Sequence, residues 1–199
     1  YLRWRTYQLR DGVVKSGQPA PIVQNQDSYL APVTAPIAKQ LLMDEVMRLD
    51  DSCCLLQSGE HQVFIAEAER IPQLLHEIGR LRELTFRATG EGTGREIDLD
   101  LYDNYYLHLF IWNSDKQEVV GAYLMRRGSG DAFHLDYLAV VPEHRRRGLG
   151  SWLTGHAIGI AESKGGRQLR VSHRRLWRFF DRYGFSDDAG AQHFVFTPE

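Results

Sequence analysis

The chain has 199 residues, of which 43% are hydrophobic and 25% are charged, and its formal net charge is −2. This composition is that of an ordinary globular protein, so it excludes a disordered or low-complexity chain. No apolar stretch reaches the roughly 20 residues that a membrane-spanning helix needs. The near-neutral charge also gives no general attraction to nucleic acid or anionic lipid. We therefore expect no membrane span and no nucleic-acid partner.

The two cysteines, Cys53 and Cys54, are adjacent in the sequence. Two are too few for a disulfide framework or a zinc site, and the histidines lack the spacing of metal ligands. We therefore predict no metal site and a reducing, cytoplasmic location. The first residues do not form a signal peptide. The chain starts with Tyr1 rather than Met, which favours a fragment or a processed chain.

Residues 1–35 show no steady periodicity and contain three prolines, so we interpret them as a tail or linker. Residues 36–199 are predicted to form a single domain. Apolar residues recur at helical spacing in 71–86, and residues 113–117 separate two strand-like runs as a hairpin turn would. The predicted helices are 36–49, 71–86, 148–164 and 174–183; the predicted strands are 61–67, 105–112, 118–125, 133–141, 168–172 and 193–197. This order predicts an α/β (α+β) fold, a mixed sheet with helices on its faces.

The most informative stretch runs from Leu138 to Ser151, where a strand ends at Pro142 and a basic turn leads into a glycine-rich helix start. The first turn of a helix has free backbone amides and the positive end of the helix dipole. Glycines let the backbone approach a phosphate closely, and arginines neutralise its charge. The stretch lacks the Gly-Lys-Ser/Thr of a Walker loop and the three glycines of a dinucleotide-binding fingerprint. It therefore predicts a site for two linked phosphates.

These residues resemble the signature of the GNAT superfamily of acyl-CoA N-acyltransferases, Arg/Gln-x-x-Gly-x-Gly/Ala after a strand of the form Leu-x-Val-x-Pro. The chain has Leu138, Val140 and Pro142, followed by Arg145-Arg146-Arg147-Gly148-Leu149-Gly150. A second mark of the family, an aromatic pair before Gly-Phe, corresponds to Phe179-Phe180 and Gly184-Phe185. The resemblance covers about residues 60–199. It implies a mostly antiparallel sheet that is splayed at its fourth strand.

The resemblance also implies how a donor would bind, with acetyl-CoA or another acyl-CoA as the thioester. Backbone groups of the strand before the turn would pair with the pantetheine arm, and the turn would hold the diphosphate. The helix with the aromatic pair would complete the site, its first residue being a histidine where the family often has asparagine. The residues concerned are Leu138, Ala139, Val140, Arg145, Arg146, Arg147, Gly148, Leu149, Gly150, Ser151, His173 and Phe180.

The first half carries a different resemblance. Arg82 and Phe86, followed by spaced acids, are similar to the acceptor side of acyl-homoserine-lactone synthases and ornithine-lipid N-acyltransferases. These GNAT relatives take acyl groups from acyl carrier protein, which makes that protein an alternative donor and partner. Asp98, Asp100 and Asp103 are the acids in question, and they either bind a cationic acceptor amine or form a solvated loop with helix caps. The segment 59–123 also resembles the second half of lysophospholipid-acyltransferase fusions.

Amide formation from a thioester requires that the attacking amine lose a proton. His134 and Asp136 are two residues apart on a predicted strand and so share one face. His134 takes the place of a glutamate base found in several family members, and a histidine titrates in a suitable range. Asp136 either orients His134 or serves as the base itself. Phe180 stands where the family often has a tyrosine acid, so the thiolate leaves unassisted or another residue acts.

Three hypotheses follow from these residues. The leading one is a GNAT-type N-acyltransferase, and most simply an N-acetyltransferase, that moves an acyl group from coenzyme A to a small-molecule or peptide amine. The alternative is a carrier-protein-dependent enzyme that makes an N-acyl amino acid or lipid. The third is a catalytically idle GNAT-like binding module. The acceptor, the acyl length and the oligomeric state, a homodimer included, stay open because acceptor loops vary within a fold.

Overall fold

The computed structural model describes residues 30–88, 90, 92–128, 130–171, 177–188 and 191–195. Eight strands form one sheet in the order β1-β2-β3-β4-β5-β6-β8-β7. All neighbouring pairs are antiparallel except β5 and β6, which are parallel. The strands are β1 (Cys54–Ser58), β2 (His61–Glu67), β3 (Leu107–Asn113), β4 (Glu118–Arg127), β5 (Ala132–Val140), β6 (Gln168–Val171), β7 (Ser186–Asp188) and β8 (Ala191–Val195). The predicted mixed, mostly antiparallel sheet is confirmed.

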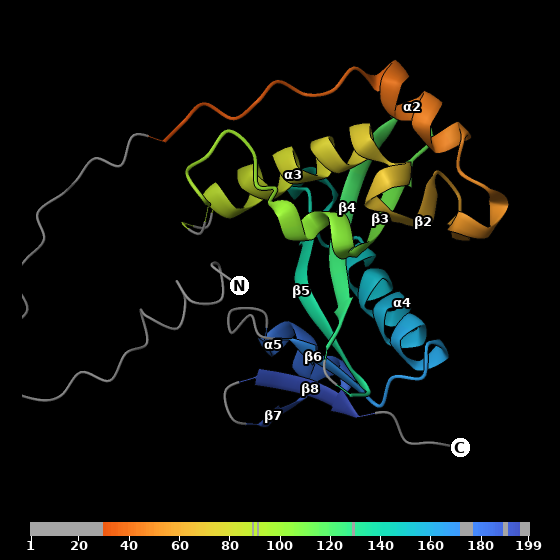
Figure 1. Cartoon of the computed structure of the whole chain (residues 1–199), viewed down its shortest axis with the longest axis vertical. Helices are drawn as coiled ribbons and strands as arrows, with labels where there is room; N and C mark the ends of the chain where they lie inside the picture. The colour runs from red at the N-terminus through yellow and green to blue at the C-terminus, as the bar shows by residue number, and fades with distance from the viewer. Residues whose placement is uncertain are drawn as a thin grey trace, which may run out of the picture.

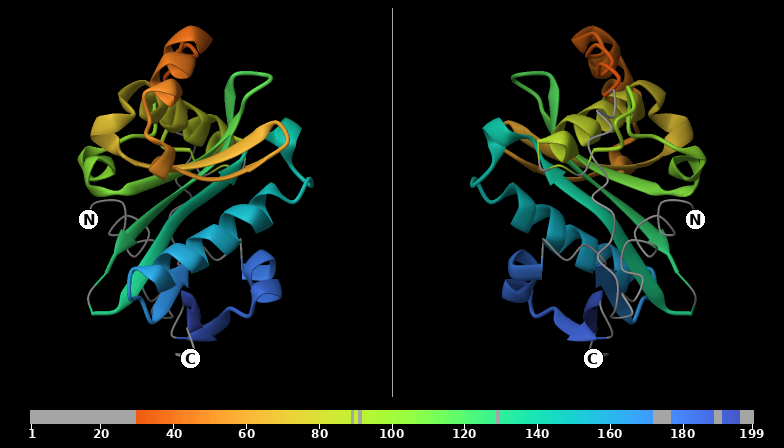
Figure 2. Two further views of the ribbon diagram at one scale, coloured as in Figure 1. Left: turned by 90° about the vertical axis from the view of Figure 1, so that its right-hand side faces the viewer. Right: turned by 90° about the vertical axis from the view of Figure 1, so that its left-hand side faces the viewer.

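Helices cover both faces of this sheet, as Figure 1 shows. The helices α2 (Lys39–Met47) and α3 (Pro72–Arg87) lie on one face. The other face carries α4 (Leu149–Ser163) and the short α5 (Trp177–Phe180). Figure 2 shows α4 and α3 on opposite sides of the strands. No helix in the described ranges is long and apolar enough to cross a membrane.

Two hydrophobic cores result, one under each helical layer. The apolar stripe of α3 buries Leu74 and Ile78 against Phe110 of β3. The helix α4 buries Leu153 and Ala157 against the opposite face. A side chain at Gly79 would overlap Leu99, with 2.4 Å between the added Cβ and Leu99 Cγ, so this glycine lets the segment after α3 pack directly on the helix. The cores hold β4 and β5 rigidly in the centre of the sheet.

Several predicted boundaries shift by one to three residues, and two strands were not predicted. The edge strand β1 has a mostly exposed pattern without alternation, and β7 has only three residues, so neither leaves a hydrophobic period in the sequence. With β1 included, the splayed strand is β5, the fifth rather than the fourth. Of the predicted tail, residues 1–29 lie outside the described residues, and Ala31 and Thr34 donate backbone hydrogen bonds to Gly94 and Glu96. The domain division stays a prediction.

Candidate active site

The sheet opens beside the second half of β5. This strand pairs with β4 along its whole length, whereas its described ladder with β6 ends where Leu135 faces Val171. A β-bulge leaves Asp136 as the extra residue between Tyr137 and Leu135 in the pairing with β4. The bulge bends β5 at the end of the β6 ladder. The residues from Asp136 to Val140 therefore present a backbone edge that no described strand covers, as expected for the predicted splay.

A small, open hollow occupies this position. Its walls come from both layers, because Phe86 belongs to α3 and Phe180 to α5. The hollow therefore lies where the strands part, next to residues of both helical layers. Its lining residues are Phe86, Leu135, Asp136, Tyr137, Leu138, Val171 and Phe180.

The basic turn follows β5 directly. A short 3₁₀ turn, Pro142–His144, leads to Gly148, which caps α4 at its N-terminus with φ +84°. Arg146 also has a positive φ of 59°, a conformation that costs energy in a residue with a side chain. The Nε of Arg145 donates to the carbonyl oxygen of Val140 at 2.9 Å, so this arginine fastens the turn to the strand. The 3₁₀ turn, the positive φ angles and this hydrogen bond keep the turn compact where the chain leaves the sheet.

The backbone amides of this turn are available to a ligand. In the described part of the chain, no protein acceptor is recorded for the amides of Arg146 through Ser151, and the first amide bonded in α4 is that of Trp152, which donates to Gly148 at 2.9 Å. These amides lie at the positive end of the α4 dipole and next to three arginines. Unsatisfied donors, helix dipole and arginines together fit an anion with several oxygens.

The aromatic residues of α5 pack against the start of α4. Phe180 is fully buried, with ring centroids 5.1 Å from both Phe179 and Phe185. A Cβ at Gly150 would lie 3.2 Å from the Phe179 ring, so a glycine lets the two helices approach. The hydroxyl groups of Tyr183 and Ser151 are hydrogen-bonded. The structure thus brings Phe180 and the turn together, while His173 lies outside the described residues.

His134 and Asp136 lie near one another on β5, together with an arginine that the sequence analysis did not single out. The Nε of Arg126 donates to Asp136 Oδ2 at 2.6 Å. Burial lowers the pKa of His134 below its usual value; Arg126 and Arg170 act in the same direction, and Asp136 opposes them. His134 is therefore held neutral at neutral pH, the form that can accept a proton.

Two of the spaced acids, Asp98 and Asp103, are buried and pair with Arg82. Arg82, Asp98 and Asp103 are at most 2% exposed. Arg82 lies 3.3 Å from Asp98 (Nε to Oδ2) and donates to Asp103 Oδ1 from Nη1 at 2.6 Å. Asp100 caps the 3₁₀ turn Leu101–Tyr105 by accepting from the amide of Tyr102. In this structure Asp98 and Asp103 bind a buried arginine of the chain, and their role in acceptor binding stays a prediction.

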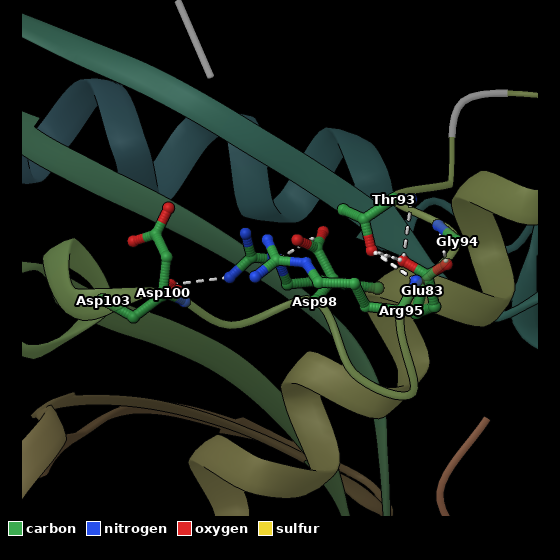
Figure 3. Close-up of polar contacts among 8 residues, drawn as sticks. Glu83, Thr93, Gly94, Arg95, Asp98, Asp100 and Asp103 are labelled. Atoms are coloured by element: carbon green, nitrogen blue, oxygen red, sulfur yellow. Dashed lines mark hydrogen bonds and ion pairs between the residues drawn. The ribbon is translucent and has the colours of Figure 1, made fainter. Parts of the chain in front are cut away.

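This buried network supports one wall of the hollow. The guanidinium of Arg82 lies 5.0 Å from the centroid of the Tyr137 ring, which meets Phe86 edge-on at 5.3 Å. Tyr137 was not among the predicted site residues, although its alternation with Leu138 on the strand is a signal that it faces α3. In the same region Glu83 accepts from Thr93 and Gly94 and thereby anchors the loop that follows α3 (Figure 3).

The comparisons with known proteins agree with this geometry. The sequence profile of the acetyltransferase (GNAT) domain family matches residues 81–140, from α3 to the end of β5. The fold is similar to that of a GNAT family acetyltransferase from Brucella melitensis in complex with acetyl-CoA, with a TM-score of 0.52, 18% identity, and coverage of 69% of this chain and 90% of that one. The described chain therefore has the fold of GNAT proteins, and residues 81–140 match the GNAT domain family. The predicted resemblance is therefore confirmed.

Two curated relatives carry the same description, glycine N(alpha)-acyltransferase. This chain is 36% identical over 94 residues to the protein from Phocaeicola vulgatus, covering 46% of the chain and 28% of that protein. It is 35% identical over 104 residues to the one from Bacteroides thetaiotaomicron, covering 51% of the chain and 31% of that protein. The matches span less than a third of the length of either relative.

Proposed function

We propose that this protein is a GNAT-type N-acyltransferase that moves an acyl group from a coenzyme A thioester to a primary amine. One observation carries the proposal: the amides from Arg146 to Ser151 have no recorded protein acceptor and lie at the N-terminus of α4, next to the parted strands. The names of the two relatives support an amino acid as acceptor, and the complex of the Brucella protein supports acetyl-CoA as donor.

In this proposal the turn and the hollow hold different parts of the donor. The turn from Arg145 to Ser151 binds the diphosphate, and the edge formed by Leu138, Ala139 and Val140 faces the pantetheine arm. The thioester supplies an activated acyl carbon. His134, held neutral, accepts a proton from the acceptor's ammonium group. Asp136 accepts a hydrogen bond from Arg126 and so fixes the position of that guanidinium beside His134. The C–N bond forms as the C–S bond breaks, giving an amide, the thiol of coenzyme A and one released proton.

Phe180 has no proton to donate to the leaving sulfur. It is fully buried among Phe179 and Phe185 and lines the hollow, so its role is to exclude water from the thioester. A thiolate is a good leaving group at neutral pH because thiols have pKa values near 8.5. The thiolate therefore leaves without a general acid and is protonated from water.

The donor is tested by quantifying free thiol and N-acylated glycine with acetyl-CoA, a long-chain acyl-CoA and an acyl-pantetheine that lacks the diphosphate. The proposal predicts amide product from a coenzyme A donor and much weaker reaction from the pantetheine donor, because only coenzyme A offers two linked phosphates to the turn. Product from acyl carrier protein alone would favour the carrier-protein alternative. Absence of product with every donor would leave the idle binding module. The cytoplasmic location and the homodimer stay predictions.

The role of His134 predicts a pH dependence. A base acts only when neutral, so the rate constant kcat/KM should fall as the pH decreases through the pKa of His134. Since burial and the two arginines lower that pKa, the midpoint of the decrease lies below about 6.5. The measurement is a pH–rate profile of the wild type and of His134→Gln. An identical acidic limb in both proteins would reject His134 as the base.

A further inference from the structure

Four basic side chains form a row across four neighbouring strands. In the strand register, Arg126 of β4 faces His134 of β5, His134 faces Arg170 of β6, and Arg170 faces His193 of β8. Residues that face one another across paired strands project from the same side of the sheet and contact one another. The row, defined as Arg126, His134, Arg170 and His193, therefore forms a single band on one face.

The row lies on the face that α4 does not cover. Leu135 and Leu169 are the neighbours in sequence of His134 and Arg170, and both are buried in the core beneath α4. Because successive side chains on a strand alternate, the row faces the opposite side, the side of α3. The Arg126 side chain is 37% exposed, and Arg170 is also exposed. The band is thus accessible to a ligand.

Arg126 and Arg170 are each held by hydrogen bonds that do not use all of their N–H donors. Arg126 uses Nε for Asp136, and no described group is recorded as accepting from its two terminal nitrogens. Arg170 uses Nε and one terminal nitrogen for Gln168 Oε1, at 3.1 and 2.9 Å, which leaves its other terminal nitrogen. Fixed guanidinium groups with free donors are suited to binding a carboxylate, since little side-chain entropy is lost.

The row begins at the edge of the hollow. Asp136 lines the hollow and accepts from Arg126, so the guanidinium of Arg126 lies at the mouth through which an acceptor reaches the thioester. Asp136 neutralises only one of the two arginines, and His134 is held neutral between them. Arg170 thus adds a positive charge near the hollow that Asp136 does not pair with.

We propose that Arg126 and Arg170 bind the carboxylate of the acceptor, which makes the substrate a small α-amino acid rather than a simple amine. The inference rests on the proposed acyl transfer and adds to it the group that selects the acceptor. In an α-amino acid the carboxylate and the amine are separated by one carbon. A carboxylate at Arg126 thus keeps the amine next to His134 and the hollow.

The test compares two acceptors of similar size, one with a carboxylate and one with a neutral amide in its place. Glycine and glycinamide are assayed with acetyl-CoA by thiol release and product mass, in the wild type and in Arg126→Gln and Arg170→Gln. We expect the wild type to prefer glycine by at least about tenfold in kcat/KM, although the amine of glycinamide is less basic, because charge-assisted hydrogen bonds select the carboxylate. Arg126→Gln should remove most of this preference and Arg170→Gln part of it. The matched control is Arg167→Gln, at an exposed ion pair outside the row.

A binding measurement complements the kinetics. Titration of N-acetylglycine and N-acetylglycinamide into the protein, followed by calorimetry, should show binding of the acid alone, lost in Arg126→Gln and retained in Arg167→Gln. Transfer to both acceptors at equal rates would overturn the carboxylate site while leaving the acyltransferase intact. Failure of every amine would reject the acyltransferase instead. Recognition of an acidic carrier protein by the row, with no discrimination between the acceptors, would also overturn the proposal.

Discussion

Replacing Gly148 with glutamate is expected to weaken coenzyme A binding by roughly 100-fold, about 2.7 kcal/mol. The residue caps α4 with φ +84°, and an added Cβ has no neighbour within 4 Å, so the side chain itself meets no obstacle. The left-handed backbone strain costs about 1 kcal/mol, and a negative charge at a helix N-terminus partly offsets it. The fold should therefore persist while the new carboxylate repels the diphosphate and competes for the amides of the turn.

The matched control is Gly159→Glu. Gly159 lies on the exposed side of the same helix with open space around it. It is about 16 Å further along the helix axis at 1.5 Å per residue, beyond the screening length of about 8 Å at physiological salt. Calorimetric titration with coenzyme A should give the wild-type dissociation constant for this variant. Equal affinity of Gly148→Glu and Gly159→Glu would contradict a diphosphate site in the turn.

Replacing Arg82 with methionine is expected to lower the free energy of unfolding by roughly 3–5 kcal/mol, the cost of breaking a buried ion pair by removing one partner. The guanidinium is 2% exposed and is shared by Asp98 and Asp103, which are equally buried. Methionine preserves most of the volume, so the loss reports on the two carboxylates rather than on a cavity. The contact with Tyr137 would be lost as well, which links the network to the wall of the hollow.

Urea unfolding measures this effect. The triple variant Arg82→Met, Asp98→Asn, Asp103→Asn should recover part of the stability because it removes the buried charges together with their partner. The control, Arg167→Met, breaks an exposed pair with Asp131 and should change the free energy of unfolding by less than about 1 kcal/mol. A single Arg82→Met variant as stable as the wild type would show that the buried Asp98 and Asp103 do not need the guanidinium for the stability of the fold.

The bounds of long elements with a clear hydrophobic period were predicted well from the sequence. The strand β2 has the predicted bounds, and α3 differs by one residue at each end, because both have a clear apolar period and a turn signal at each side. The strand β1 lacked such a period: it is paired on one edge and mostly exposed. A hydrophobic period thus does not reveal a strand that is only slightly buried, and β1 was found through its pairing with β2.

The turn after β5 was predictable because all its parts are contiguous in the chain. The surroundings of the acids were not, because the contacts between Arg82 and both Asp98 and Asp103 depend on the segment 97–103 folding back onto α3, which Gly79 allows. The row through Arg126 and Arg170 depends on strand register and on the bulge at Asp136. A one-residue change of register would place these arginines on the other face, so no single-strand pattern predicts them.

The most direct measurement follows the backbone amides of the turn while coenzyme A is added to the ¹⁵N-labelled protein. We expect large, saturable chemical-shift changes at the amides of Arg146, Gly148 and Gly150, and much smaller ones with pantetheine, which lacks the diphosphate. Binding of coenzyme A that leaves these amides unchanged would contradict the assignment of the turn as the diphosphate site. The proposed donor chemistry would then have to be located elsewhere in the fold.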